Sequence, residues 1–359
     1  MSRPTRIEID TAALEHNVRK IRACAPGTRV IAMVKANAYG CGMSTVLPVL
    51  AEHVDALGVA CLEEAIAVRK LGIDCDCVLF QGIFSQEECR LMSQYRLECV
   101  IHNHAQLQWI LSANLQGKLK IWIKIDTGMH RLGFAPDDVP GVVQTLLACP
   151  GVDPDIILIT HLACADETQN TYNQLQWNVF QSVCKSYPEL KRSVANSATI
   201  LAWPEMHADI VRPGIMVYGV SPFTDKNGLD LGLKPVMRFV SVITVLHNYA
   251  AETPVGYGCS WSSQYPSVIG VVPVGYGDGY PRHIDENTPV WVNNRRAPIV
   301  GRVSMDMLTI DLTLHPDVKL GDEVELWGPH LPIEVIAKAA QTIPYDLLCR
   351  VSPRVRGAL

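Results

Sequence analysis

Short apolar runs alternate with helix-like segments as far as about residue 233, and this alternation limits the possible folds more than any other feature. The apolar runs lie near Val30–Val34, Ala56–Ala60, Cys77–Phe80, Glu98–Ile101, Leu119–Ile125, Ile156–Thr160, Ser193–Asn196 and Ile210–Arg212. Helical spacing of apolar residues occurs between most of them, over Leu62–Leu71, Glu87–Tyr95, Ala105–Leu111, Val139–Ala148 and Gln174–Tyr187. Strands that alternate with helices form parallel sheets. About eight such units predict a closed, TIM-like (β/α)8 barrel.

The pattern changes after about Leu233, which predicts a second domain. Helical spacing is absent until Ile333–Gln341, and strand-like runs separated by Gly, Pro and Asn take its place. These runs are Phe239–Leu246, Val268–Val274, Val290–Val292, Pro298–Val303, Met307–Leu312 and Glu323–Trp327. We therefore predict a barrel domain over residues 1–233 and a mostly antiparallel β domain over residues 234–359. Residues 1–10 are expected to form a strand that joins the second domain.

Lys35 stands out because it ends an apolar run and precedes residues that suit a turn, among them Asn37 and Gly40. Desolvation beside a buried strand disfavours the ammonium form, so we expect a lowered pKa for Lys35. A partly neutral amine can form a Schiff base with an aldehyde. The simpler alternative is a surface lysine that closes a strand.

Polar and basic residues also follow several other apolar runs, and the C-terminal ends of barrel strands carry the active sites of such enzymes. These residues are Lys124, Asp126, Arg131, His161, Asn196, Ser197, Arg212 and Gly214. Each alone has a structural explanation. Their convergence on one rim predicts a functional site there.

Two glycine-rich segments in the second domain need separate interpretation. The segment 275–282, Gly-Tyr-Gly-Asp-Gly-Tyr-Pro-Arg, lacks the dinucleotide-binding spacing, and no helical pattern follows it. We interpret it as a rigid turn. Tyr257 lies between Gly256 and Gly258, which leaves its phenol exposed as a reactive group or as part of a turn.

Composition excludes several classes of function. The net charge is −5 and no dense basic run occurs, so we expect no nucleic-acid partner. No apolar run can span a bilayer, and Met1–Asp10 resembles no secretory signal, so we expect no membrane partner and a cytoplasmic location. The 12 cysteines are scattered, which favours reduced, buried thiols. Cys75 and Cys77 are too close together for a usual zinc pair, and no metal site is predicted.

Several motifs, in order along nearly the whole chain, resemble those of the alanine racemases, enzymes of fold type III that use pyridoxal 5′-phosphate (PLP). The motifs are A-M-V-K-A-N-A-Y-G with Lys35, K-I-D-T-G-M-H-R-L-G with Lys124 and Arg131, Asn196-Ser197, V-R-P-G-I with Arg212, V-G-Y-G with Tyr257, V-G-Y-G-D-G-Y-P-R, and S-M-D-M with Met305 and Asp306. Coincidence does not explain so many motifs in one order.

The resemblance implies how PLP is held. Lys35 carries the cofactor as a Schiff base, and Arg212 faces the pyridine nitrogen. An arginine cannot take up a proton, so it leaves this nitrogen unprotonated, which suppresses side reactions such as transamination. The phosphate is bound by hydroxyl groups and main-chain N–H groups, a good combination for an anion. The phosphate-binding residues are Tyr39, Ser197, Gly214, Ile215 and Tyr345, and Asn196 belongs to the same cofactor-binding group.

The resemblance also assigns catalysis to two bases on opposite faces of Cα, Lys35 and the partner subunit's Tyr257, in a homodimer with shared active sites. A tyrosine ordinarily titrates near pH 10, so a phenol used as a base needs cationic neighbours. His161 is the family's link between the phenol and Arg212. Residues implied to contact the substrate are Arg131, Met305, Asp306 and Tyr276, with Tyr276 at the entrance between subunits. Lys124 is a candidate for carbamylation; the alternative is an ordinary lysine paired with Asp126 or Asp278.

The function implied is an isomerase that interconverts L-alanine and D-alanine and supplies D-alanine for the peptidoglycan of a bacterial cell wall. A racemase of another small amino acid, such as serine, is the first alternative. A related decarboxylase would place an acidic group on the ring nitrogen, and Arg212 argues against it. A barrel-only protein that carries PLP would lack the second domain.

Overall fold

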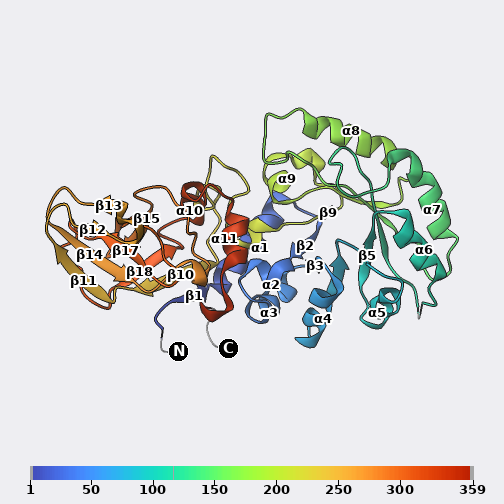
Figure 1. Ribbon diagram of the computed structural model, residues 1–359. Coiled ribbons are helices and arrows are strands. Elements are labelled where there is room, and N and C mark those ends of the chain that lie inside the picture. Colours follow the sequence, from blue (N-terminus) through green and yellow to red (C-terminus); the bar gives the residue numbers. More distant parts are fainter. Residues whose placement is uncertain (1–2, 116, 356–359) are drawn as a thin grey trace.

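A closed parallel barrel forms the first part of the molecule, on the right in Figure 1. The computed structural model describes residues 3–115 and 117–355. The barrel strands follow chain order, and the first pairs with the last: β2 (Arg29–Met33), β3 (Ala56–Val59), β4 (Asp76–Leu79), β5 (Glu98–Ile101), β6 (Ile121–Lys124), β7 (Ile157–Ile159), β8 (Lys191–Ser193) and β9 (Ile210–Val211). The predicted (β/α)8 barrel is therefore confirmed.

Apolar side chains fill the interior of the barrel, and helices cover its outside (Figure 1). Ile31, Val78, Val100 and Trp122 belong to the fully buried central cluster, so the barrel is a packed core with no pore. The helices of this part are α1 (Thr11–Cys24), α3 (Met43–His53), α4 (Leu62–Lys70), α5 (Glu88–Gln94), α6 (His104–Ser112), α7 (Val139–Leu147), α8 (Tyr172–Cys184) and α9 (Ser197–Ala202). The central packing fixes the rim of the barrel, where the loops carry polar side chains.

An antiparallel sheet forms the second part, on the left in Figure 1. Its strands lie in the order β1 (Arg6–Ile9), β10 (Met237–Val242), β18 (Glu323–Trp327), β15 (Pro289–Val292), β16 (Arg295–Val300), β17 (Leu308–Asp311), β14 (Ser267–Val272) and β11 (Val245–Tyr249). A short ribbon, β12 (Pro254–Val255) with β13 (Trp261–Ser262), lies apart from it. The predicted antiparallel β domain is confirmed as a fold class, and we propose the domain division at residues 233 and 234.

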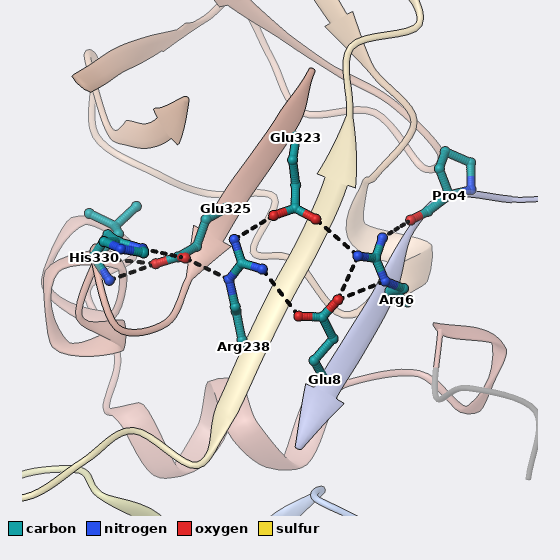
Figure 2. Close-up of polar contacts among 8 residues, drawn as sticks. Pro4, Arg6, Glu8, Arg238, Glu323, Glu325 and His330 are labelled. Carbon is teal, nitrogen blue, oxygen red and sulfur yellow. Dashed lines mark hydrogen bonds and ion pairs between the residues drawn. The ribbon is translucent and has the colours of Figure 1, made fainter. Parts of the chain in front are cut away.

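A network of ion pairs ties the first strand of the chain to this second sheet (Figure 2). The Arg238 guanidinium donates to Glu8 (3.1 Å), Glu323 (2.5 Å) and Glu325 (2.8 Å), and Arg6 bridges Glu8 and Glu323. The exposed pairs each contribute little. Because Glu325 is buried, loss of Arg238 would leave its charge with only the hydrogen bonds from His330 and Leu331. The network therefore holds β1 against β10.

Three details differ from the sequence-based expectations. The run Phe239–Leu246 divides into β10 and β11, and the strand expected at Ser193–Asn196 ends at Ser193. Asn196 instead caps α9, because its side chain accepts the Thr199 N–H at 3.0 Å. Helix α11 (Pro344–Arg350) follows α10 (Ile333–Ala339) and was not predicted.

Two further expectations concern membrane-spanning segments and the burial of the cysteine thiols. Within the described residues, no helix has the length and apolar character that a bilayer crossing requires. Only some of the thiols are buried as expected, since Cys259 and Cys349 are exposed.

Candidate active site

A cavity of about 800 Å³ opens at the C-terminal ends of the barrel strands. All the predicted cofactor residues line it, together with Lys124: Lys35, Tyr39, Arg131, His161, Asn196, Ser197, Arg212, Gly214, Ile215 and Tyr345. Helix α11 packs on α2 (Lys35–Tyr39) and brings Tyr345 from the second domain to this cavity. The site thus depends on both domains.

Lys35 begins an unusual turn immediately after strand β2. The next four residues, 36–39, all have positive φ angles between 51° and 55°, so segment α2 is a left-handed turn. Each non-glycine residue in this conformation costs roughly 1–2 kcal/mol. Glu64 holds the turn, because its carboxylate accepts the N–H groups of Ala36 and Ala60, each at 2.7 Å. Strain of this kind persists where surrounding contacts enforce it and is typical of functional sites.

The cavity concentrates positive charge. Desolvation lowers the pKa of Lys35, and the neighbouring Arg131 lowers it further. Desolvation and the cations Arg212 and Arg131 lower the pKa of Lys124 to about 8. The expected direction for Lys35 is confirmed. Although Lys35 is accessible from the cavity mouth, both amines lose a proton more easily than a fully solvated lysine does.

Arg212 lies at the centre of this charge and is 5% exposed. Its Nη1 donates to Ser193 Oγ at 2.5 Å, and its Nη2 donates to the carbonyl oxygens of Thr160 (2.9 Å) and Val194 (3.1 Å). Burial lowers its pKa to about 9, so the guanidinium remains charged at neutral pH. None of the hydrogen bonds among residues 3–115 and 117–355 uses its Nε. This N–H is therefore available to a ligand acceptor.

His161 contacts Arg212 directly, with 3.3 Å between Nδ1 and Nη2. A guanidinium can only donate, so Nδ1 of the imidazole accepts and Nε2 carries the hydrogen. Burial and the neighbouring cations, Arg212 first, hold the pKa of His161 well below its usual value. The imidazole is neutral at pH 7.

A cradle for an anionic group lies where α9 begins. Ser197 Oγ accepts the N–H groups of Gly214 (2.9 Å) and Met216 (3.3 Å). A Cβ at Gly214 would come within 2.5 Å of Tyr39 Oη, so only glycine allows the backbone and this phenol to approach so closely. Hydroxyl groups and main-chain donors in this arrangement fit a phosphate.

The four remaining candidates lie elsewhere in the chain. Tyr257, Met305 and Asp306 are exposed on the second domain and do not line the cavity in the part of the chain that is described. Tyr257 follows β12, which Figure 1 places at the far side of the second domain from the barrel. Tyr276 lines a different cavity, of about 490 Å³, together with Arg282 and Arg350. One chain alone therefore does not assemble all the predicted residues.

Sequence reasoning missed two residues that shape the site. Glu64 clamps the turn after Lys35, and Tyr218 donates its hydroxyl to the Met33 carbonyl at 2.9 Å while stacking on Tyr39 with 4.7 Å between ring centroids. Glu64 could have been proposed as a site residue, since it lies shortly after the end of barrel strand β3. Nothing in the sequence around Tyr218 indicates its role.

The fold and the cavity define a two-domain barrel enzyme with a reactive amine in a cationic pocket suited to a phosphate-bearing ligand. Family models described as "Alanine racemase, N-terminal domain" and "Alanine racemase, C-terminal domain" match residues 9–222 and 236–358. An alanine racemase of Legionella pneumophila (strain Lens) is 56% identical over 357 residues, which cover 99% of each chain. That of Shewanella sediminis is 46% identical over 354 residues, 99% of this chain and 98% of the relative.

Solved structures agree with these relatives. The alanine racemase of Acinetobacter baumannii matches with a TM-score of 0.94 and 41% identity over 99% of both chains. The biosynthetic alanine racemase of Pseudomonas aeruginosa matches with the same TM-score and 42% identity, over 99% of this chain and 98% of that one. The chain belongs to the alanine racemase family, a family of isomerases.

Proposed function

We propose that this protein interconverts L-alanine and D-alanine with bound PLP. The observation that carries the proposal is the Lys35 amine, whose pKa is lowered, in a cationic cavity beside Arg212 and the cradle at Gly214. The full-length relatives that are named alanine racemases support the substrate.

The cavity residues fit PLP group by group. Ser197, Tyr39, Tyr345 and the Ile215 N–H would hold the phosphate, with Asn196 shaping the loop. The Gly214 N–H would join them by exchanging its hydrogen bond to Ser197 Oγ for one to the phosphate. Arg212 Nε is the donor available to the ring nitrogen, and Arg131 would bind the phenolic oxygen of PLP and the substrate carboxylate. Lys35 would form the covalent attachment.

Inversion at Cα needs proton transfer on both faces. PLP, when bound, supplies an electron sink that acidifies the Cα–H bond of an amino acid. Lys35 Nζ would hold or release the proton on one face, and the phenolic oxygen of the partner subunit's Tyr257 would do so on the other. His161 would donate its Nε2 hydrogen toward that phenol, because its Nδ1 is occupied by Arg212.

A homodimer is the assembly that completes this site. Tyr257 is 72% exposed and Met305 53% exposed, so both are accessible to a second subunit. Both lie on the second domain, and neither lines the cavity of its own chain. We propose that they enter the cavity of a second copy, where Met305 offers its backbone N–H to the substrate carboxylate, Asp306 orients this loop and Tyr276 lines the entrance.

We also propose that Lys124 is carbamylated. The neutral Lys124 amine nitrogen would attack CO₂ and release its proton to solvent. Counted from the ammonium form two protons leave, so a half-buried cation becomes an anion. No carboxylate lies within ion-pair distance of Lys124 in the described part of the chain; Asp126 accepts from Gly128 and His130, and Asp278 pairs with Arg3 and Arg354. A carbamate would offset the surrounding positive charge and orient Arg131.

The biological role we propose is supply of D-alanine for peptidoglycan in a bacterial cytoplasm. The test is chiral chromatography of L-alanine incubated with the purified, PLP-loaded protein, with L-serine and L-lysine as competing substrates. Formation of D-alanine faster than the other D-enantiomers supports the proposal. Faster inversion of serine would favour a racemase of another small amino acid, and no inversion of any of them would exclude the proposed function.

A further inference from the structure

We propose that a cluster formed by the buried Asp278 and the partly exposed Arg3 and Arg354 positions the segment Ser304–Asp306, and with it the contacts that one subunit makes to the active site of the other. This inference rests on the proposed function, because it concerns the loop that carries Met305. The three residues, here called the Asp278 cluster, act through that loop and are positioning residues.

The Asp278 side chain is completely buried and accepts hydrogen bonds from three directions. Arg3 donates from Nη1 (2.8 Å) and Nη2 (3.1 Å), Arg354 donates from Nε (2.6 Å), and the Gly275 N–H donates at 2.9 Å. Burial by itself raises the pKa of this carboxyl, but the hydrogen bonds from Arg3, Arg354 and the Gly275 N–H together outweigh it. The net pKa is lowered, so the carboxyl is ionised at neutral pH. The buried Asp278 carboxylate therefore connects Arg3, near the start of the described chain, with Arg354, near its end.

Arg354 links this carboxylate to the loop. Its Nη2 donates to Asp306 Oδ1 (2.8 Å) and to the Met305 carbonyl (3.4 Å). Main-chain bonds run in parallel, from Tyr276 N to Ser304 O (3.0 Å) and from Gly277 N to Met305 O (2.9 Å). The position of the loop is thus determined by the Asp278 cluster and by the turn that begins at Gly275.

Close packing makes this arrangement specific. A Cβ at Gly275 would come within 2.2 Å of Ser304 O, and one at Gly277 within 2.7 Å of Arg354 Nη2. The segment 275–282, interpreted from the sequence as a rigid turn, therefore receives both the loop and the guanidinium against its backbone.

The loop presents an N–H donor at Met305 and is closed internally by hydrogen bonds between Ser304 and Met307. None of the hydrogen bonds among the described residues uses the Met305 N–H, and the Met305 side chain is 53% exposed. Hydrophobic packing therefore does little to hold the loop. Removal of one partner of a buried, hydrogen-bonded charge pair is strongly destabilising for the groups left behind. Loss of Arg354 should therefore displace Met305 without disturbing the cofactor cavity of its own chain.

The experiment compares Arg354→Met with Arg295→Met in the PLP-loaded dimer. Arg295 pairs with Asp317 at an exposed position of the same domain and serves as the matched control. We expect Arg354→Met to raise the KM for alanine about tenfold with a smaller change in kcat, since one charge-assisted contact to the loop is lost. Arg354→Lys, which keeps the charge with fewer donors, should fall between wild type and Arg354→Met. Arg295→Met should leave KM unchanged.

A hybrid dimer distinguishes action on the other subunit from action within one chain. Subunits that carry Arg354→Met and subunits that carry Lys35→Ala are co-expressed with different tags, and the mixed dimer is purified. One of its sites combines an intact Lys35 with an intact loop from the other chain, so we expect alanine turnover with the wild-type KM.

Three results would overturn the inference. The first is an unchanged KM in Arg354→Met, and the second is a hybrid dimer whose activity shows only the raised KM. The third applies if Arg354→Met fails to fold, and it is a wild-type KM in Arg354→Lys. Failure of the proposed function is a different result, because the wild-type protein would then not racemise alanine.

Discussion

Replacement of Lys124 by methionine should stabilise the protein, because Lys124 is a half-buried cation among other cations. Its pKa is lowered from 10.5 to about 8, and each unit corresponds to about 1.36 kcal/mol. Folding therefore costs up to roughly 3 kcal/mol at pH 7 for this one group. The cost is fully present below about pH 8, where both folded and unfolded chains are protonated. The cost falls between about pH 8 and pH 10.5, because the chain then loses this proton on folding and the loss becomes easier as the pH rises. It is gone above pH 10.5, where both folded and unfolded chains are neutral at Lys124.

Urea unfolding followed by circular dichroism, in buffer freed of CO₂, tests this value. Lys124→Met should gain up to roughly 3 kcal/mol at pH 7 and less than about 1 kcal/mol near pH 10. Lys70→Met is the control, because Lys70 is exposed on α4, and it should change the free energy of unfolding by less than about 0.5 kcal/mol. Added bicarbonate should stabilise wild type and leave Lys124→Met unchanged. An equal gain at both pH values, or no gain at all, would refute the electrostatic argument.

Three further predictions concern the cofactor and the two bases. Lys35→Ala should lose both the visible absorbance of protein-bound PLP and racemisation; retained turnover would contradict the role of this amine. Replacement of Tyr257 by phenylalanine should slow proton transfer more in one direction than in the other. The measurement is deuterium uptake from solvent by L- and D-alanine, which should be unequal; equal uptake would argue against two bases. Gly214→Ala should weaken PLP affinity at least about tenfold, or about 1.4 kcal/mol, because the new Cβ comes within 2.5 Å of Tyr39 Oη; an unchanged affinity in a PLP titration would show that the cradle does not hold the phosphate.

The barrel could be predicted because its signal is repetitive and local. Each strand is an apolar run, and each helix places apolar residues at regular spacing, so errors at single boundaries did not change the fold class. Helix α11 was missed because it is short and its start at Pro344 resembles a loop. Its placement matters, since it brings Tyr345 to the cavity from the other domain.

The convergence of the cofactor residues could be predicted from the position of active sites in barrels and from the motifs. The residues that hold those side chains in place could not be predicted in this way. Glu64 bonds to Ala36 across 28 positions of sequence, and Tyr218 bonds to Met33 across 185. Contacts between residues so far apart in the chain leave no local pattern, because they arise only when the barrel closes.

By itself, the sequence determined the barrel, the β domain and the residue types of the site, because strand and helix periodicities and the order of motifs are properties of the chain alone. Tertiary structure decided the charge state of the site and the support of its loops. Desolvation of Lys35, Lys124 and Arg212 depends on how much water the closed barrel excludes. The bond from Arg3 to Asp278 depends on a fold that brings together residues 275 positions apart.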